Sequence, residues 1–137
     1  MLFSLIKLPD EPIVIIKSDV DLDYYLQHGP TIRQRVLRIT EGTGFPLYIL
    51  VDLSLTDVSF VDILMWLDAQ ADKPSELVYH PDICVCLVGP QPMLGVAARK
   101  IKERLNLELP WYPNLDAGLA DVRATLSQDN DPPADRE

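Results

Sequence analysis

Apolar residues follow two periodicities along the chain, and each predicts a different element. Two nearly unbroken apolar runs, LYILVDL (47–53) and DICVCLV (82–88), have no polar face, which is typical of inner strands. Shorter apolar stretches at 2–8 and 13–17 flank the turn signal PDEP and predict an N-terminal hairpin. A short strand is expected at 107–112, at a sheet edge, because Pro110 cannot donate a ladder hydrogen bond.

Apolar residues spaced by three and four predict a helix after each inner strand. The predicted helices lie at about 18–40, 59–72, 92–105 and 114–126. In the first, Gly29 and Pro30 are expected to interrupt the helix, with Pro30 in the first turn of a second segment. In the second, Phe60, Leu64 and Leu67 are expected to share the buried stripe.

The resulting order, ββαβαβαβα, predicts an α/β fold with a mostly parallel sheet, because strands alternating with helices require crossovers. A chain of 137 residues fits one domain, which we place at residues 1–126. The remaining segment, SQDNDPPADRE (127–137), is polar throughout, and we expect it to be disordered.

The formal net charge of −9 argues against nucleic acid as a partner, since phosphates require clustered positive charge. The two basic stretches, RQRVLR (33–38) and RKIKER (99–104), are interpreted as solvated helix faces. No apolar run approaches the roughly 20 residues of a membrane span, and the start MLFSLIKLPDEP does not resemble a signal peptide. We therefore expect no membrane span and a cytoplasmic location.

The only cysteines, Cys84 and Cys86, lie two residues apart in a predicted strand and so point to the same face. That placement is awkward for a disulfide, and two thiolates alone make an incomplete zinc site. We expect them to act as small buried apolar residues, with no metal or cofactor.

The segment VDLSLTDVSFVDILMW (51–66) concentrates polar residues where a strand gives way to a helix. Asp57 and Ser59 are candidate caps for the helix N-terminus. In parallel sheets, ligand sites also lie beyond the carboxyl ends of the strands, so a binding role stays open. Asp52, Asp57 and Asp62 could serve a hydrolytic or metal-dependent enzyme, although the chain has no G-x-S-x-G, phosphate-loop or H-E-x-x-H motif.

Three stretches together resemble the STAS fold of sulphate transporters and anti-sigma-factor antagonists, and its SpoIIAA-like members most. They are LYILVDLSLTDVSFVD, DICVCLVGPQPMLGVAARKI and LNLELPWYPNLDAGLADVRATL, and the resemblance covers about residues 1–126. In the antagonists a serine directly after the aspartate is phosphorylated. Here Asp62 is followed by Ile63, which cannot accept phosphate, so that switch is not carried over. Ser59 and Ser54 are the displaced candidates for phosphorylation, and Ser59 is the first of them.

The resemblance implies a non-enzymatic signalling or regulatory module that binds a partner protein, or a second copy of itself as a homodimer. The candidate partner-binding residues are Asp57, Ser59, Asp62, Met65, Trp66 and, at the edge strand, Trp111. The alternative is a domain that binds a small apolar molecule or lipid in a pocket between the helices that follow residues 20 and 59.

Overall fold

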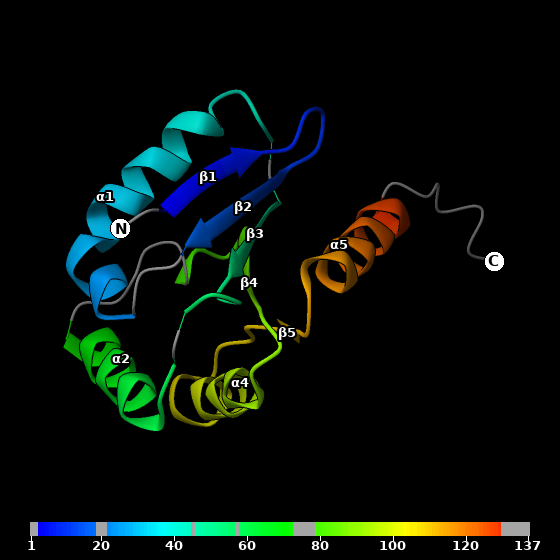
Figure 1. The fold of residues 1–137 in the computed structure, drawn as a ribbon. Coiled ribbons are helices and arrows are strands. Elements are labelled where there is room, and N and C mark those ends of the chain that lie inside the picture. Colours follow the sequence, from blue (N-terminus) through cyan, green and yellow to red (C-terminus); the bar gives the residue numbers. More distant parts are fainter. Residues whose placement is uncertain (1–2, 19–21, 45, 57, 73–78, 130–137) are drawn as a thin grey trace.

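The structure is a computed structural model that describes residues 3–18, 22–44, 46–56, 58–72 and 79–129. Five strands and four helices are described, in the order that the sequence predicts (Figure 1). They are β1 (Phe3–Lys7), β2 (Ile13–Ser18), α1 (Leu22–Ile39), β3 (Leu47–Asp52), α2 (Phe60–Asp72), β4 (Ile83–Val88), α4 (Pro92–Leu105), β5 (Trp111–Tyr112) and α5 (Leu115–Asp129). The predicted α/β fold class is confirmed.

The five strands form one sheet in the order β1-β2-β3-β4-β5. β1 pairs antiparallel with β2 as the predicted hairpin, and the remaining neighbours are parallel. β3 and β4 run side by side from the Leu47–Ile83 pair to the Asp52–Val88 pair, as their uniformly apolar sequences predict. The carboxyl ends of the parallel strands therefore meet at one edge of the sheet.

The helices cover the two faces of the sheet unequally. α1, α2 and α4 cover one face, and α5 covers the other (Figure 1). The first face contributes alternate strand residues such as Val14, Ile49 and Val85 to a large core with the three helices. The second face contributes Ile15, Leu50 and others to a smaller core against Val122 of α5. The alternation follows from the two-residue period of a strand.

The prediction that Gly29 and Pro30 divide the first helix is wrong, because α1 runs unbroken from Leu22 to Ile39 with Pro30 inside it. An interior proline costs about 3 kcal/mol. Beyond it, however, Ile32 and Val36 are buried in the larger core. Each buried side chain of this size contributes roughly 1.5–3 kcal/mol, which offsets the loss of one helical hydrogen bond.

The last predicted strand is shorter than its sequence suggested, although it does lie at the sheet edge. β5 comprises Trp111 and Tyr112, which pair with Leu87 and Val88. Pro110 contributes only its carbonyl oxygen, which accepts a hydrogen bond from the Leu87 N–H at 2.8 Å. Residues 107–110 form no strand, and Leu109 is buried in the larger core instead.

The described chain extends three residues beyond the predicted domain boundary at 126, because α5 continues to Asp129. The rest of the expected tail, residues 130–137, lies outside the described residues. Within the described part of the chain, no helix combines the length and apolar character that crossing a bilayer requires.

Candidate functional site

The polar residues after β3 form a tight turn. Asp52 Oδ1 accepts hydrogen bonds from the Ser54 N–H at 3.0 Å and from Ser54 Oγ at 2.5 Å. The Thr56 N–H then donates to the Leu53 carbonyl oxygen at 3.0 Å. An aspartate that bonds the backbone two residues on closes a turn without help from other elements. Asp52 therefore acts locally to end β3.

Ser59 and Asp62 form a reciprocal cap at the start of α2. The Asp62 N–H donates to Ser59 Oγ at 3.1 Å, and the Ser59 N–H donates to Asp62 Oδ2 at 2.9 Å. This arrangement satisfies two N–H groups that the first turn of a helix would otherwise leave unpaired. The acidic side chain also interacts favourably with the positive end of the helix dipole.

Gln91 connects the turn that follows β3 to the segment between β4 and α4. Its Nε2 donates to the Leu53 carbonyl oxygen at 2.7 Å and to the Thr56 carbonyl oxygen at 2.8 Å. Gln91 is also the residue immediately before α4, so one side chain fixes the turn after β3 relative to the helix after β4. The sequence could not reveal this contact, because the residues it joins are 35 and 38 positions apart.

Large apolar side chains are exposed on the same segment. We call the group of four that spans the turn and the first turns of α2 the α2 apolar surface. Its members are Leu55, Val61, Met65 and Phe60, with exposed fractions of 79%, 62%, 48% and 43%. Scattered exposed apolar residues are common, whereas a contiguous apolar patch is typical of a contact surface. Val61 and Met65 lie one helical turn apart and so are neighbours on α2.

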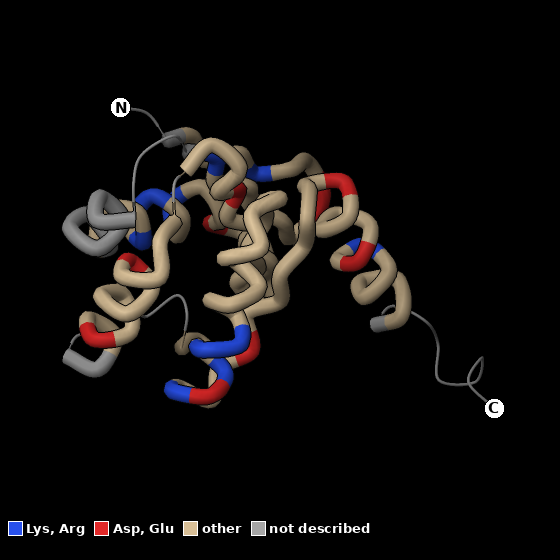
Figure 2. The backbone as a smooth tube through the Cα atoms, turned by 60° about the horizontal axis from the view of Figure 1, so that its bottom comes forward, with Lys and Arg blue, Asp and Glu red and all other residues tan. Residues whose placement is uncertain are grey.

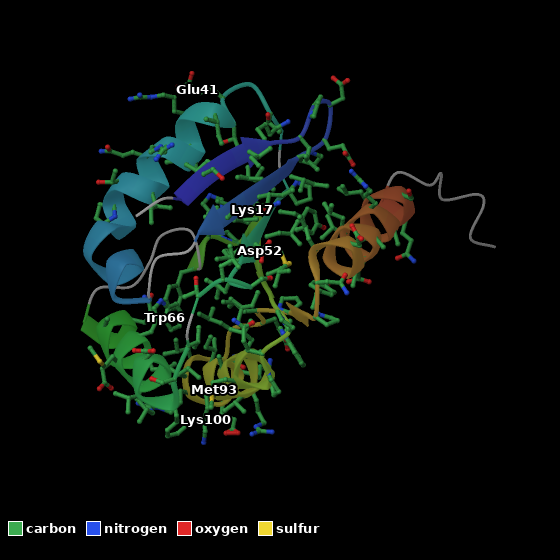
Figure 3. The ribbon with its side chains drawn as sticks, viewed as in Figure 1. Lys17, Glu41, Asp52, Trp66, Met93 and Lys100 are labelled. Carbon is green, nitrogen blue, oxygen red and sulfur yellow. The ribbon has the colours of Figure 1, made fainter. Side chains whose placement is uncertain are left out.

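The structure brings some of the predicted partner-binding residues together and separates others. Ser59, Asp62 and Met65 lie together at the start of α2. Trp66 lies on the side of α2 that faces the sheet, half-buried against the larger core (Figure 3). Asp57 lies outside the described residues.

Trp111 belongs to a different part of the molecule, at the β5 edge. Its Nε1 donates to the Gly89 carbonyl oxygen at 2.9 Å, and its ring lies against Gly95 of α4. The Trp111 side chain therefore packs between β5 and α4, although part of it stays exposed.

Sequence reasoning missed Leu55, Phe60 and Val61. The expectation that Phe60 lies on the buried stripe is wrong, because that stripe is Ile63, Leu67 and Gln70. A signal was present, since nearly every position of FVDILMWL is apolar and one buried stripe does not account for so many. The surplus of apolar residues on α2 indicated a second apolar face.

The charges on and around α4 are mixed in sign. Basic and acidic residues are interspersed along the chain (Figure 2). Three basic side chains of α4 form ion pairs, Lys100 with Glu103, Lys102 with Glu108 and Arg104 with Asp68. Among the described residues, no group of three or more His, Cys, Asp or Glu side chains could hold a metal ion.

Comparisons of the chain with protein-family models, with curated proteins and with solved structures found no match. The STAS resemblance, the absence of enzymatic activity and the apolar-ligand alternative therefore stay predictions. The aspartate-based enzyme does so too, with Asp52 and Asp62 each engaged in local hydrogen bonds.

Proposed function

We propose that the chain is a non-enzymatic, STAS-like interaction module that binds a partner protein through the α2 apolar surface. The observation that carries this proposal is the exposure of Leu55, Phe60, Val61 and Met65 on one short segment. Burying such side chains against a partner would contribute about 25 cal/mol for each Å² of apolar area removed from water.

The supporting structure beneath the surface suits binding without rearrangement. The Ser59–Asp62 cap fixes the first turn of α2, and Gln91 holds the Leu53 and Thr56 carbonyl groups. A surface fixed before binding loses less conformational entropy when its partner arrives. These contacts are the role that we propose for the predicted residues Ser59 and Asp62, while Met65 contacts the partner directly.

Charge favours a different protein over a second copy as the partner. The chain has a formal net charge of −9, so two copies repel each other as they approach. Asp62 and Asp68 lie on α2 beside the apolar side chains. We therefore expect the partner to present apolar side chains surrounded by basic ones.

The experiment compares Val61→Asp with Leu37→Asp. Leu37 is the matched control, because it is 40% exposed on α1, outside the α2 apolar surface. The partner is isolated by crosslinking in the cells that produce the protein, then purified and titrated against each variant by calorimetry. We expect Val61→Asp to weaken binding roughly 30-fold, as for a contact worth about 2 kcal/mol, and Leu37→Asp to leave it unchanged.

Equal affinity of the two variants would exclude the α2 apolar surface as the binding site. Sedimentation of the unmodified protein shows whether it is a monomer or a homodimer. A dimer that Val61→Asp dissociates and Leu37→Asp does not would replace the proposed partner with a second copy. A monomer that crosslinks to nothing would overturn the proposal.

A further inference from the structure

The two cysteines lie on the second face of the sheet, beneath α5. Cys84 and Cys86 are opposite Tyr48 and Leu50 of β3, in the smaller core. Cys86 is 1% exposed, whereas Cys84 is only half-buried. β5 pairs with β4 only at Leu87 and Val88, so Cys84 lies beyond the end of that pairing.

The two sulfur atoms are in contact, with Cys84 Sγ and Cys86 Sγ 4.0 Å apart. We assign Cys86 as the hydrogen-bond donor, because its deeper burial opposes loss of its proton. The donated hydrogen bond lowers the pKa of Cys84 from an ordinary 9.0 to about 7, while burial and the charge of Asp121 act in the opposite direction. The pKa of Cys86 is raised, first by the same hydrogen bond and then by burial.

Among the described residues, the groups that act on the Cys84 thiol supply no positive charge. Tyr48 lies opposite Cys84 on β3, and Tyr112 of β5 donates its hydroxyl proton to Asp121 of α5. Burial and this hydrogen bond raise the pKa of Tyr112, which keeps it neutral. Within the described residues, the hydrogen bond from Cys86 is therefore the main interaction that stabilises a Cys84 thiolate.

A disulfide between the two cysteines does not fit a regular strand. A disulfide requires Cβ atoms about 3.5–4.5 Å apart. Residues two apart in a strand are separated by roughly 6.4–6.8 Å along it. β4 is paired with β3 along its whole length, so closing the gap would break an inner strand of the sheet. Cys86 can therefore activate Cys84 but cannot reach it to form a bond.

We propose that Cys84 is a site of reversible oxidation, at which a hydroperoxide oxidises the sulfur and a small external thiol then forms a mixed disulfide with it. In the first step the Cys84 thiolate attacks one peroxide oxygen, the O–O bond breaks, and the leaving oxygen takes a proton to become water or an alcohol. The product is a sulfenic acid. In the second step the external thiolate attacks that sulfur and expels hydroxide, which leaves as water after protonation.

Intact-mass measurement tests the chemistry on the full chain at pH 7. The protein is treated with one equivalent of hydrogen peroxide and with reduced glutathione, and the adduct is located by peptide mapping. We expect one glutathione on Cys84, removable by dithiothreitol, and none on the Cys84→Ser variant. Loss of two hydrogens with no adduct would show a Cys84–Cys86 disulfide, and an adduct on Cys86 would show the roles reversed. Either result overturns the proposal, as does the absence of any adduct.

The role of Cys86 is tested by the pH dependence of Cys84 alkylation with iodoacetamide. The rate should rise with pH to half its maximum near pH 7. Cys86→Ser keeps a donor and should preserve this profile. Cys86→Ala removes the hydrogen-bond donor and should slow alkylation at pH 7 about fivefold. The fraction of Cys84 present as thiolate falls, and the higher nucleophilicity of each thiolate compensates only in part. Wild-type protein unfolded in urea supplies the pH profile of an unperturbed thiol. If the folded and unfolded wild-type proteins give the same profile, the proposal is overturned, whether or not the variants fold.

Discussion

At the scale of single residues, Ser59 is a structural cap whose contribution can be measured. Replacing Ser59 with alanine removes the acceptor for the Asp62 N–H and should lower the free energy of unfolding by about 1 kcal/mol. Ser59→Thr keeps a hydroxyl and should cost much less. Urea denaturation of the three proteins checks this, and an equal loss in the alanine and threonine variants would show that the hydroxyl does not cap α2.

The same geometry bears on Ser59 as a phosphorylation candidate. The Ser59 oxygen already accepts a helix N–H, and the Asp62 carboxylate lies beside it on the Ser59 N–H. A phosphate there would gain from the helix dipole but would lie next to a like charge. The phosphorylation of Ser59 stays a prediction. Its electrostatic cost comes from Asp62, which is also the partner of Ser59 in the cap.

At the scale of elements, two glycines set how closely the helices approach the sheet. A Cβ on Gly118 of α5 would lie 2.7 Å from Leu50 Cδ2, and Leu50 is fully buried. A Cβ on Gly95 of α4 would lie 3.0 Å from the Trp111 ring, which is partly exposed and can shift. Both changes gain about 1 kcal/mol of helix propensity.

We therefore expect opposite outcomes for the two alanine variants. Gly118→Ala should lower the free energy of unfolding by roughly 1–3 kcal/mol through overpacking, in spite of the better helix propensity. Gly95→Ala should be close to neutral. Thermal and urea unfolding of both variants measure the difference. A stabilised Gly118→Ala would mean that α5 can move away from Leu50 at little cost.

The elements also show where sequence patterns carry enough information. Leu47–Asp52 and Ile83–Val88 lack a polar face, and burial on both sides of an inner strand leaves no alternative placement. Pro30 was misjudged because the burial of residues after it, and not its own preference, keeps α1 continuous. Local capping at Ser59 was predictable, since both partners lie within one turn. The Gln91 contacts were not, because they depend on how two junctions meet in three dimensions.

At the scale of the whole molecule, α5 is the described helix that covers the second face of the sheet, and a charged pair joins it to the other end of the chain. Arg123 of α5 donates from Nε to Glu11 Oε2 at 2.9 Å and from a terminal guanidinium nitrogen to Glu11 Oε1 at 3.0 Å. The two residues are 112 positions apart, so the pair links the turn between β1 and β2 to the last helix. Two parallel hydrogen bonds make it more specific than a single surface contact.

This pair should make the attachment of α5 dependent on pH. The hydrogen bonds from Arg123 lower the pKa of Glu11 below its ordinary 4.5, so folding favours the ionised carboxylate. For a lowered pKa, the stabilisation is complete above pH 4.5 and is lost as pH falls through the lower value in the folded protein. Arg123→Ala should therefore reduce stability at pH 7, and its difference from wild type should shrink as the pH falls below 4.5.

Urea unfolding at several pH values measures this difference, with Arg104→Ala as the matched control. Arg104 contacts Asp68 at 3.8 Å through one nitrogen, so its removal should have a smaller effect at pH 7. Both pairs are exposed to solvent, and added salt should weaken both. A gap between Arg123→Ala and wild type that stays constant from pH 7 to pH 3 would show that Arg123 holds α5 through packing of its aliphatic stem and not through the Glu11 charge.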